Sequence, residues 1–264
     1  MTRFFPPLFT KRISLFISVF LTLAVSNQLA WADKTLIHDA RYTGEYKSIN
    51  IVMARKLWQL SENEYKLETK AKNFLGSVVE SEHFTWDKKR GIQPLQYHYE
   101  QKIFGIKKIR QIDFDWENQQ ALSTDKDKKA TLELKPGTLG PLSYQLQMQL
   151  DLLRHPEVDA DRTLEYTFVN RNKLKDYTFA LDTELLNQKP ELKDNVIVLT
   201  RTNEGSDKTT RLWLNPHDRF TLIKLEQIKE KSTHTLTFEK GSYRHPLDGT
   251  PYASALSPAD SVEE

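Results

Sequence analysis

Apolar and polar residues alternate with a period of two over much of the chain. In residues 111–117, the apolar side chains of Ile112, Phe114 and Trp116 alternate with polar ones. Residues 95–103, 164–169, 177–185 and 236–238 repeat the pattern. Successive side chains of a strand point to opposite faces, so each segment has one dry and one wet face, as strands of antiparallel sheets have. The pattern predicts a mainly β protein.

Turn-forming residues separate the strand-like segments at hairpin spacing, which gives about a dozen strands. The short connections leave little room for crossover helices, so a meander is the simplest topology. We therefore expect a large curved antiparallel meander, either a half-barrel or an open barrel. The turn segments are Ser61-Glu62-Asn63, Asn73 to Gly76, Asp87 to Gly91, Gly105, Asn118-Gln119, Gly205-Ser206 and Asn215-Pro216.

One segment has a helical period instead. Leu142, Leu146, Leu150 and Leu153 recur at steps of four, four and three, which places them on one helical face. Pro156 prevents the helix from continuing. The sequence predicts a helix over residues 142–154 that packs as a plug or lid on the open side of the sheet. A helix that binds a partner is the alternative.

The first 32 residues differ from the rest of the chain. Three basic residues precede an apolar run from Ile13 to Val25, and the segment ends in Ala30-Trp31-Ala32. This order is typical of a secretory signal peptide, with cleavage after Ala32. A transmembrane anchor is the alternative, but thirteen helical residues span roughly 20 Å, less than the ~30 Å hydrocarbon core. We expect an exported, periplasmic protein with no stable membrane anchor.

The predicted organisation is a signal peptide (residues 1–32), a single β domain (33–244) and a disordered tail (245–264) rich in Pro, Gly, Ser, Ala and acidic residues. The whole chain carries 38 Lys and Arg against 36 Asp and Glu, a net charge of +2. Without the three basic residues of the leader the net charge is −1. A nearly neutral chain has no global field for nucleic acid, and none is expected as a partner.

Three motifs, in order, resemble an uncharacterised exported bacterial envelope family, domain-of-unknown-function family 3108. They are Tyr42-Thr43-Gly44-Glu45-Tyr46, Pro136-Gly137-Thr138 followed by Pro141-Leu142-Ser143, and Leu212-Trp213-Leu214-Asn215-Pro216 with the strand from Phe220 to Gln227. The resemblance spans about residues 37–243 and implies an exported all-β domain without an established activity. Gly140 stands where this family often has an acidic residue.

Most catalytic and cofactor motifs are absent from the sequence. The chain has no cysteine, which excludes thiol catalysis and cysteine metal sites. The seven histidines are scattered, and none forms a His-x-x-x-His pair. There is no phosphate loop, nucleophile elbow or dinucleotide fingerprint. We expect no cofactor, no metal and no enzymatic activity.

Two carboxylate pairs keep a glycan hydrolase open as a less favoured function. Glu80 and Glu82 lie two residues apart on one strand, as do Asp113 and Asp115. Residues two apart point the same way, about 6.6 Å between Cα atoms, which suits paired catalytic carboxylates. Asp113 and Asp115 lie opposite the apolar Ile112 face, so a solvated outer surface is the simpler interpretation for them.

The segment from Lys102 to Arg110 is a local basic cluster around Gly105. It suits contact with anionic lipid or glycan, but a charged hairpin tip that discourages edge pairing is the simpler interpretation.

So many one-sided strands with one helix leave apolar area to cover. Either the sheet closes on itself or a groove is left for an apolar ligand. This favours a non-enzymatic periplasmic protein that binds or carries a lipid-like ligand. An interaction protein for envelope assembly, with an envelope component as its partner, is the alternative. The residues predicted to line the groove are Phe114, Trp116, Leu146, Leu150, Tyr166, Phe168 and Phe179.

Overall fold

The computed structural model describes residues 34–46, 49–157, 161–192, 195–202, 208–230 and 232–243. The predicted signal peptide (1–32), the predicted tail (245–264) and the predicted turn at Gly205-Ser206 lie outside these ranges. No helix within the described ranges is long and apolar enough to cross a membrane.

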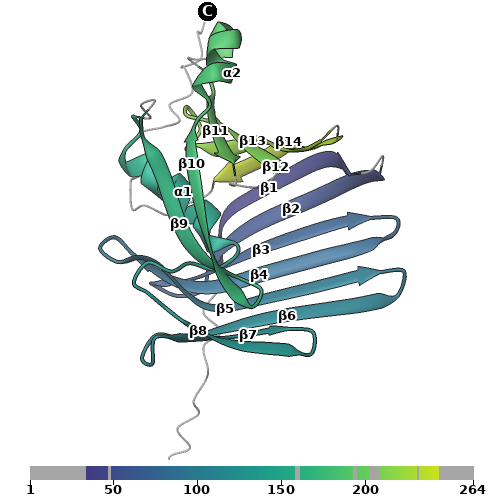
Figure 1. Ribbon diagram of the computed structural model, residues 1–264, viewed down its shortest axis with the longest axis vertical. Coiled ribbons are helices and arrows are strands. Elements are labelled where there is room, and N and C mark those ends of the chain that lie inside the picture. Colours follow the sequence, from purple (N-terminus) through teal and green to yellow (C-terminus); the bar gives the residue numbers. More distant parts are fainter. Residues whose placement is uncertain are drawn as a thin grey trace, which may run out of the picture. The chain divides into compact units, whose positions relative to one another are not determined.

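The described residues form one antiparallel sheet of fourteen strands (Figure 1). The first eight strands are β1 (Thr35–Tyr46), β2 (Ile49–Gln59), β3 (Glu64–Asn73), β4 (Gly76–Asp87), β5 (Gly91–Ile103), β6 (Ile106–Asp115), β7 (Gln120–Asp125) and β8 (Lys128–Glu133). The remaining strands are β9 (Thr163–Asn170), β10 (Lys173–Leu181), β11 (Ile197–Thr202), β12 (Lys208–Asn215), β13 (Thr221–Lys229) and β14 (Ser232–Tyr243). The mainly β, meandering fold predicted from the alternation is confirmed.

The order across the sheet is β8 to β1 followed by β14 to β9. The sheet thus consists of two meanders, which are joined where β1 pairs with β14. The first and last strands of the chain therefore lie at the centre, and β8 and β9 are the two edges. The chain between these edges, residues 134–162, carries the helix α1 (Ser143–Arg154), where the leucine spacing predicted one.

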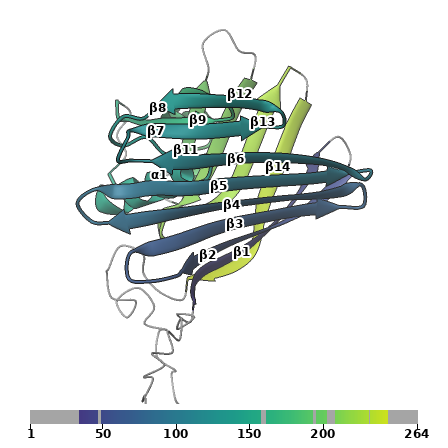
Figure 2. The ribbon, with the colours of Figure 1, turned by 90° about the horizontal axis from the view of Figure 1, so that it is seen from below.

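Helix α1 packs against the inner face of the sheet and contacts β5 and β9, one strand from each meander (Figures 1 and 2). Its side chains Leu146, Met148, Leu150 and Leu152 are buried in the same core as the inner side chains of both meanders. A sheet with one wet outer face and one apolar inner face needs such a cover, because the apolar face must be removed from water.

The two edge strands are joined without pairing directly. The Leu139 N–H donates to the Thr167 carbonyl (2.9 Å), and the Val169 N–H donates to the Leu139 carbonyl (3.0 Å). At the other end of this seam, the Ser123 hydroxyl donates to the Arg171 carbonyl (2.6 Å). Residues 134–142 thus cover part of β9, and the sheet comes close to closing around α1.

A second helix, α2 (Thr183–Gln188), follows β10 and precedes a 3-10 turn (Pro190–Leu192). The alternation placed Leu185 on a strand, which is wrong. Asp182 caps the helix, because its carboxylate accepts from the Leu185 N–H at 3.0 Å. Leu186 and Leu185 pack in a second, smaller core with Val198 and Trp213 on the outer face.

Candidate functional site

Three glutamines tie α1 to strands that are far apart in the sheet. Gln145 accepts from the Arg55 guanidinium of β2 at 2.7 Å. Gln147 accepts from the Ile92 N–H at the start of β5 (3.1 Å), and Gln149 donates to the Arg219 carbonyl (2.7 Å). Together with the leucines, these contacts fix the helix inside the sheet, so its first turn occupies a defined place on the inner face.

Glu82 of β4 receives the N-terminus of α1. Its side chain is fully buried, and Oε2 accepts from the N–H groups of Leu142 (2.7 Å) and Ser143 (3.2 Å). These N–H groups are free at the start of a helix and carry partial positive charge. Burial raises the pKa of Glu82 to about 7, although hydrogen bonds from Ser143 and Leu142 act in the opposite direction. Glu82 is therefore enclosed by protein and has no route to a substrate.

Gly140 is the position that departs from the acidic residue often found in the resembled family. A Cβ atom placed there would lie 2.2 Å from Glu82 Oε1, well inside contact distance. Glycine is therefore needed because the Glu82 carboxylate lies against the backbone at this point. The acidic group next to the start of α1 comes from β4 instead of the loop.

Two arginines face the same interior and form no ion pair with a carboxylate of the described residues. Apart from Gln145, Arg55 makes no side-chain hydrogen bond or ion pair with the described residues. Arg201 of β11 is buried; its guanidinium lies 3.7 Å from the centre of the Tyr177 ring and donates to the Thr210 hydroxyl (3.1 Å). Its Nε–H is buried without a partner within the described ranges. A buried cation without an ion pair, such as Arg201, is costly, and the half-buried Arg55 likewise forms no ion pair with a described carboxylate, so both groups are suited to an anion.

Tyr144, in the first turn of α1, links the two arginines. Burial raises the pKa of Tyr144, and the charges of Arg201 and Arg55 both lower it. The Arg55 charge also acts on five further interior groups, for each of which burial is the largest cause of the pKa shift: His38, Tyr42, Glu80, Glu82 and Tyr243. Arg55 is thus within electrostatic reach of these five groups and of Tyr144, and Tyr144 is within reach of both guanidinium groups.

The other interior charges are held by the protein itself. Burial raises the pKa of Glu80, against the opposing Arg55 charge and a hydrogen bond from Tyr97. Arg110 lies over the Tyr99 ring (4.4 Å) and forms a salt bridge with Asp125 at 3.1 Å. These pairs distinguish Arg110 from Arg55 and Arg201. We refer to Arg55, Arg201, Tyr144 and Gln145 as the anion site.

All seven residues predicted to line a groove lie in or against one core. Six are buried in it, and Trp116 packs against it, donating from its ring N–H to the Pro94 carbonyl (2.6 Å). Their rings are packed on one another: Phe114 stacks on Trp116, and Tyr166 and Phe168 contact Phe179 and Tyr177. This part of the inner face is therefore filled by α1 and by its own side chains.

Helix α1 covers only one end of the inner face. In Figures 1 and 2 the long strands β3 to β6 run on past the helix toward their far turns. Ile51 and Met53 of β2 share the inner face with Arg55, and Val78 of β4 shares it with Glu80; all three apolar side chains are half-buried. An apolar wall therefore lies directly beside the anion site.

Asp113 and Asp115 lie on the outer face, as the alternation predicted. Asp113 accepts from the side chains of Gln96 (2.9 Å) and Gln111, and Asp115 caps the β6–β7 turn through Asn118. Hydrogen bonds from Asn118 lower the pKa of Asp115. Since Glu82 is enclosed and these two carboxylates are solvated, the structure brings no two of the four candidate acids together in a cleft that a glycan could enter.

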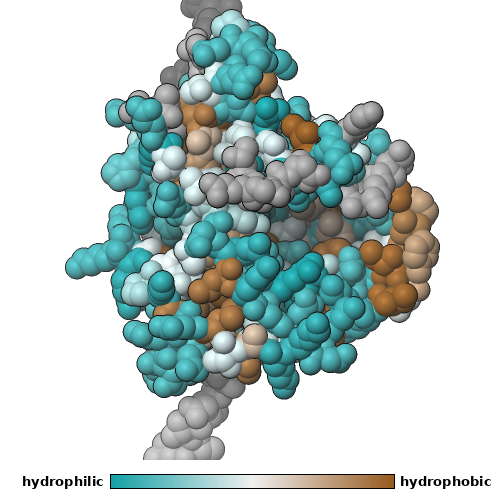
Figure 3. Space-filling model, viewed as in Figure 1, coloured by the Kyte–Doolittle hydropathy of each residue, from teal (hydrophilic) through white to brown (hydrophobic). Residues whose placement is uncertain are grey.

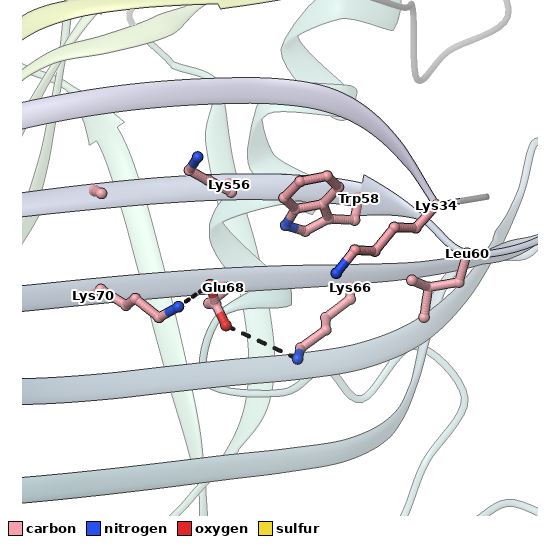
Figure 4. Close-up of a pocket in the computed structure, with 8 residues that line it drawn as sticks. Lys34, Lys56, Trp58, Leu60, Lys66, Glu68 and Lys70 are labelled. Carbon is pink, nitrogen blue, oxygen red and sulfur yellow. Dashed lines mark ion pairs between the residues drawn. The ribbon is translucent and has the colours of Figure 1, made fainter. Parts of the chain in front are cut away.

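Two hollows lie away from the anion site. One of about 440 Å³ on the outer face of β2 and β3 is lined by Trp58, by Glu68 and by four lysines, with Lys34 Nζ 4.9 Å from the Trp58 ring centre (Figure 4). Glu68 pairs with Lys70 (2.8 Å) and Lys66 (3.9 Å). The other, of about 580 Å³, lies at the seam and includes Tyr166 and Gln147. Both are lined by polar and apolar groups in about equal measure, and neither includes Arg55 or Arg201.

Within the described ranges, no three His, Asp or Glu residues gather in a way that could hold a metal ion. No pattern in the sequence indicated the anion site. Arg55 and Arg201 lie on strands whose alternation places them among inward positions, but only pairing across the sheet shows that neither forms an ion pair with a described carboxylate.

Comparisons with known proteins give a family. A family model described as "Protein of unknown function (DUF3108)" matches residues 41–238. Among solved structures, the chain is similar to a β-barrel-like protein of the domain of unknown function DUF1849 from Brucella abortus, with 12% identity, a TM-score of 0.49, and coverage of 80% of this chain and 98% of that one. No curated protein matches the chain.

Proposed function

The chain belongs to the DUF3108 family of unknown function, and from that premise we propose that it is a non-enzymatic binding protein for an amphiphile with an anionic head. The head is held by Arg55 and Arg201, and the apolar part lies along the half-buried wall of Ile51, Met53 and Val78. The observation that carries the proposal is that neither inward-facing guanidinium group forms an ion pair with a carboxylate of the described residues.

The balance of charge and apolar surface supports this choice of ligand. An anion that accepts from a guanidinium in a poorly solvated site gains strongly, because the same charge left unpaired is costly. The adjacent wall is apolar, so a hydrocarbon chain gains free energy by leaving water there. The proposal keeps the lipid-like ligand expected from the excess of one-sided strands. It moves the ligand from the filled core beside α1 to the part of the inner face that α1 leaves uncovered.

We further propose that the protein acts after export, in the periplasm. The basic, apolar and small-residue order of residues 1–32 supports this location. The hydrocarbon chain of an amphiphile must be kept from water when the amphiphile crosses an aqueous compartment, and a binding protein can do this. The chain has no cysteine, so its β sheet forms without disulfides.

Isothermal titration calorimetry with dodecyl phosphate, kept below its critical micelle concentration, tests the proposal. Arg55→Gln and Arg201→Gln should each weaken binding about tenfold or more, the usual loss for one hydrogen bond to a charged group. The uncharged 1-dodecanol should bind more weakly to the native protein and should not distinguish the variants.

Arg41→Gln is the matched control. Arg41 lies on the outer face of β1, is about half exposed and pairs with Glu239 at 2.8 Å. Its loss should leave the affinity unchanged. Equal affinity of dodecyl phosphate for the native protein and for both interior variants would refute the anion site.

A further inference from the structure

Exposed apolar side chains gather on two neighbouring turns, β3–β4 and β5–β6. Phe74 is 83% exposed and Phe104 is 74% exposed, and Ile103 and Ile106 are exposed beside them. In Figure 3 a hydrophobic area lies at the edge where Figure 1 shows these two turns. We name Phe74, Ile103, Phe104 and Ile106 the tip patch. Large apolar side chains grouped on a surface mark an interaction site more often than isolated ones do.

The two turns are fixed against each other by backbone contacts. Gly76 is the register partner of Ile103, and the Phe104 N–H donates to the Leu75 carbonyl (3.2 Å). The tip patch is thus one continuous surface at the far ends of the long strands, away from α1.

Neither turn needs its aromatic residue. In the β3–β4 turn, the Asn73 side chain accepts from the N–H groups of Leu75 (2.8 Å) and Gly76 (3.0 Å), which leaves Phe74 without a structural contact to make. In the β5–β6 turn, Phe104 has φ +48°, a left-handed conformation in which Asn or Gly is normal and a bulky residue is strained. Backbone strain at a residue that does not stabilise the fold points to a functional role for that residue.

Basic residues surround the tip patch. Residues 70–76 and 100–110 carry six basic side chains against the single carboxylate of Glu100, a net charge of +5. The Glu100 carboxylate pairs with Lys102 (3.0 Å) and Lys107 (2.8 Å). The hydrogen bond from Lys107, followed by the one from Lys102, lowers the pKa of Glu100 to about 2. Lys70 pairs with Glu68 (2.8 Å) and Arg110 with Asp125 (3.1 Å). Lys72 and Lys108 form no salt bridge with a described residue, and they keep the surface cationic.

We propose that the tip patch docks on the surface of an anionic lipid bilayer. Phe74, Phe104 and Ile106 enter the boundary between headgroups and acyl chains, and the surrounding lysines meet lipid phosphates. An apolar group ringed by Lys is the arrangement that binds such an interface, because burial of the apolar side chains and attraction of the charges act together. A second copy of the chain fits the patch poorly, since two surfaces with an excess of basic groups repel each other. The proposal does not depend on the anion site.

The cysteine-free chain allows a direct test in the full-length protein. Phe104→Cys, labelled with the environment-sensitive fluorophore NBD, is mixed with vesicles of phosphatidylcholine containing 30% phosphatidylglycerol. We expect the emission to rise about threefold or more as the label enters the bilayer. Glu117→Cys, labelled in the same way in the exposed turn at the opposite ends of the strands, is the matched control and should not respond. Any attachment through residues 1–32 is the same in both proteins.

A second arm measures partitioning by vesicle flotation. Phe74→Ser with Phe104→Ser changes only exposed side chains, so the fold should be kept, and we expect at least a tenfold loss of partitioning, with binding of dodecyl phosphate unchanged. The proposal is overturned if the labels at positions 104 and 117 respond alike, or if pure phosphatidylcholine vesicles give the same rise. It is also overturned if the rise needs no vesicles and follows protein concentration, which would show self-association.

Discussion

Two sets of charged groups face the interior of the sheet, and they differ in what balances them. Glu82 lies at the N-terminus of α1, where helix N–H groups donate to it and Gly140 leaves room for it. Arg55 lies on β2 and Arg201 on β11, and only neutral groups accept from them among the described residues. The helix therefore donates hydrogen bonds to Glu82, although burial still raises the pKa of Glu82, whereas neither guanidinium group forms an ion pair with a described carboxylate.

This difference suggests that Glu82 stabilises the fold, whereas Arg55 and Arg201 bind a ligand. The hydrogen bonds that Glu82 Oε2 accepts from Leu142 and Ser143 position the first turn of α1. A buried charge without a counter-charge costs stability, and a ligand of opposite charge removes that cost. Changes at the Glu82 side should therefore affect stability, and changes at the arginine side should affect binding.

The largest effect is expected from Gly140→Ala. The added Cβ would push against the Glu82 carboxylate and separate it from Leu142 and Ser143, which combines overpacking with a buried charge that has lost its partners. We expect the free energy of unfolding to fall by about 4 kcal/mol, measured by urea denaturation. Gly137→Ala is the control in the same loop: its φ is +83° but no atom lies within 4 Å of the added Cβ. It should cost only about 1 kcal/mol through backbone strain. Equal losses would show that Glu82 does not require Gly140.

A smaller effect should appear in the pH dependence of stability. The pKa of Glu82 is about 7 in the folded chain, raised by burial from 4.5. The folded state therefore holds a proton that the unfolded state has released, and stability falls as pH rises between these two values. The total loss is about 3 kcal/mol. Glu82→Gln should abolish this pH-dependent loss of stability. The unfolding free energy of the native protein minus that of the variant should therefore fall by about 3 kcal/mol as the pH rises from 4.5 to 8.

The native protein must be compared with Glu82→Gln because His38 also titrates in this pH range. Burial, with the Arg55 charge, lowers the pKa of His38 to about 4 from 6.5, so its contribution to stability rises with pH in that window. Between pH 4.5 and 6.5 the two groups oppose each other in the native protein. Above pH 6.5 Glu82 acts alone of the two. A flat difference between native protein and Glu82→Gln over the whole range would contradict the account.

The smallest effect is expected from Gln145→Ala, which frees the Arg55 guanidinium from its 2.7 Å hydrogen bond. Stability should fall by about 1 kcal/mol, the usual value of one such bond. Dodecyl phosphate should bind about threefold more weakly, because Arg55 must then be ordered by the ligand. Gln147→Ala removes a comparable bond to the Ile92 N–H without touching an arginine. It should cost similar stability and leave the affinity unchanged; a matching loss of affinity would place the anion site elsewhere.

Local patterns predicted most of the elements. The period-two alternation located the strands, the turn residues located the hairpins, and four leucines located α1 between Ser143 and Arg154. Helix α2 was missed because the apolar spacing of residues 177–185 continued the strand pattern. The signal for it was present in Asp182, a helix-capping residue, followed by Glu184 in the first turn.

The site could not be predicted in the same way. The sequence showed that Gly140 is unusual, but glycine is needed there because the Glu82 carboxylate lies against it, and Glu82 is almost sixty residues earlier in the sequence. Arg55 and Gln145 are ninety residues apart. Such pairs depend on which strands α1 crosses, which no local period encodes. The residues predicted to line a groove lie together in or against one core, and whether any of them meets a ligand stays a prediction.

The most direct test of the central claim is native mass spectrometry of the protein purified from its own cells, compared with the Arg55→Gln/Arg201→Gln double variant purified in the same way. The account predicts that the native protein carries an amphiphile with an acidic head and that the double variant, folded by circular dichroism, has lost it. A native protein without ligand, or the same bound species at the same occupancy in both proteins, would contradict the account.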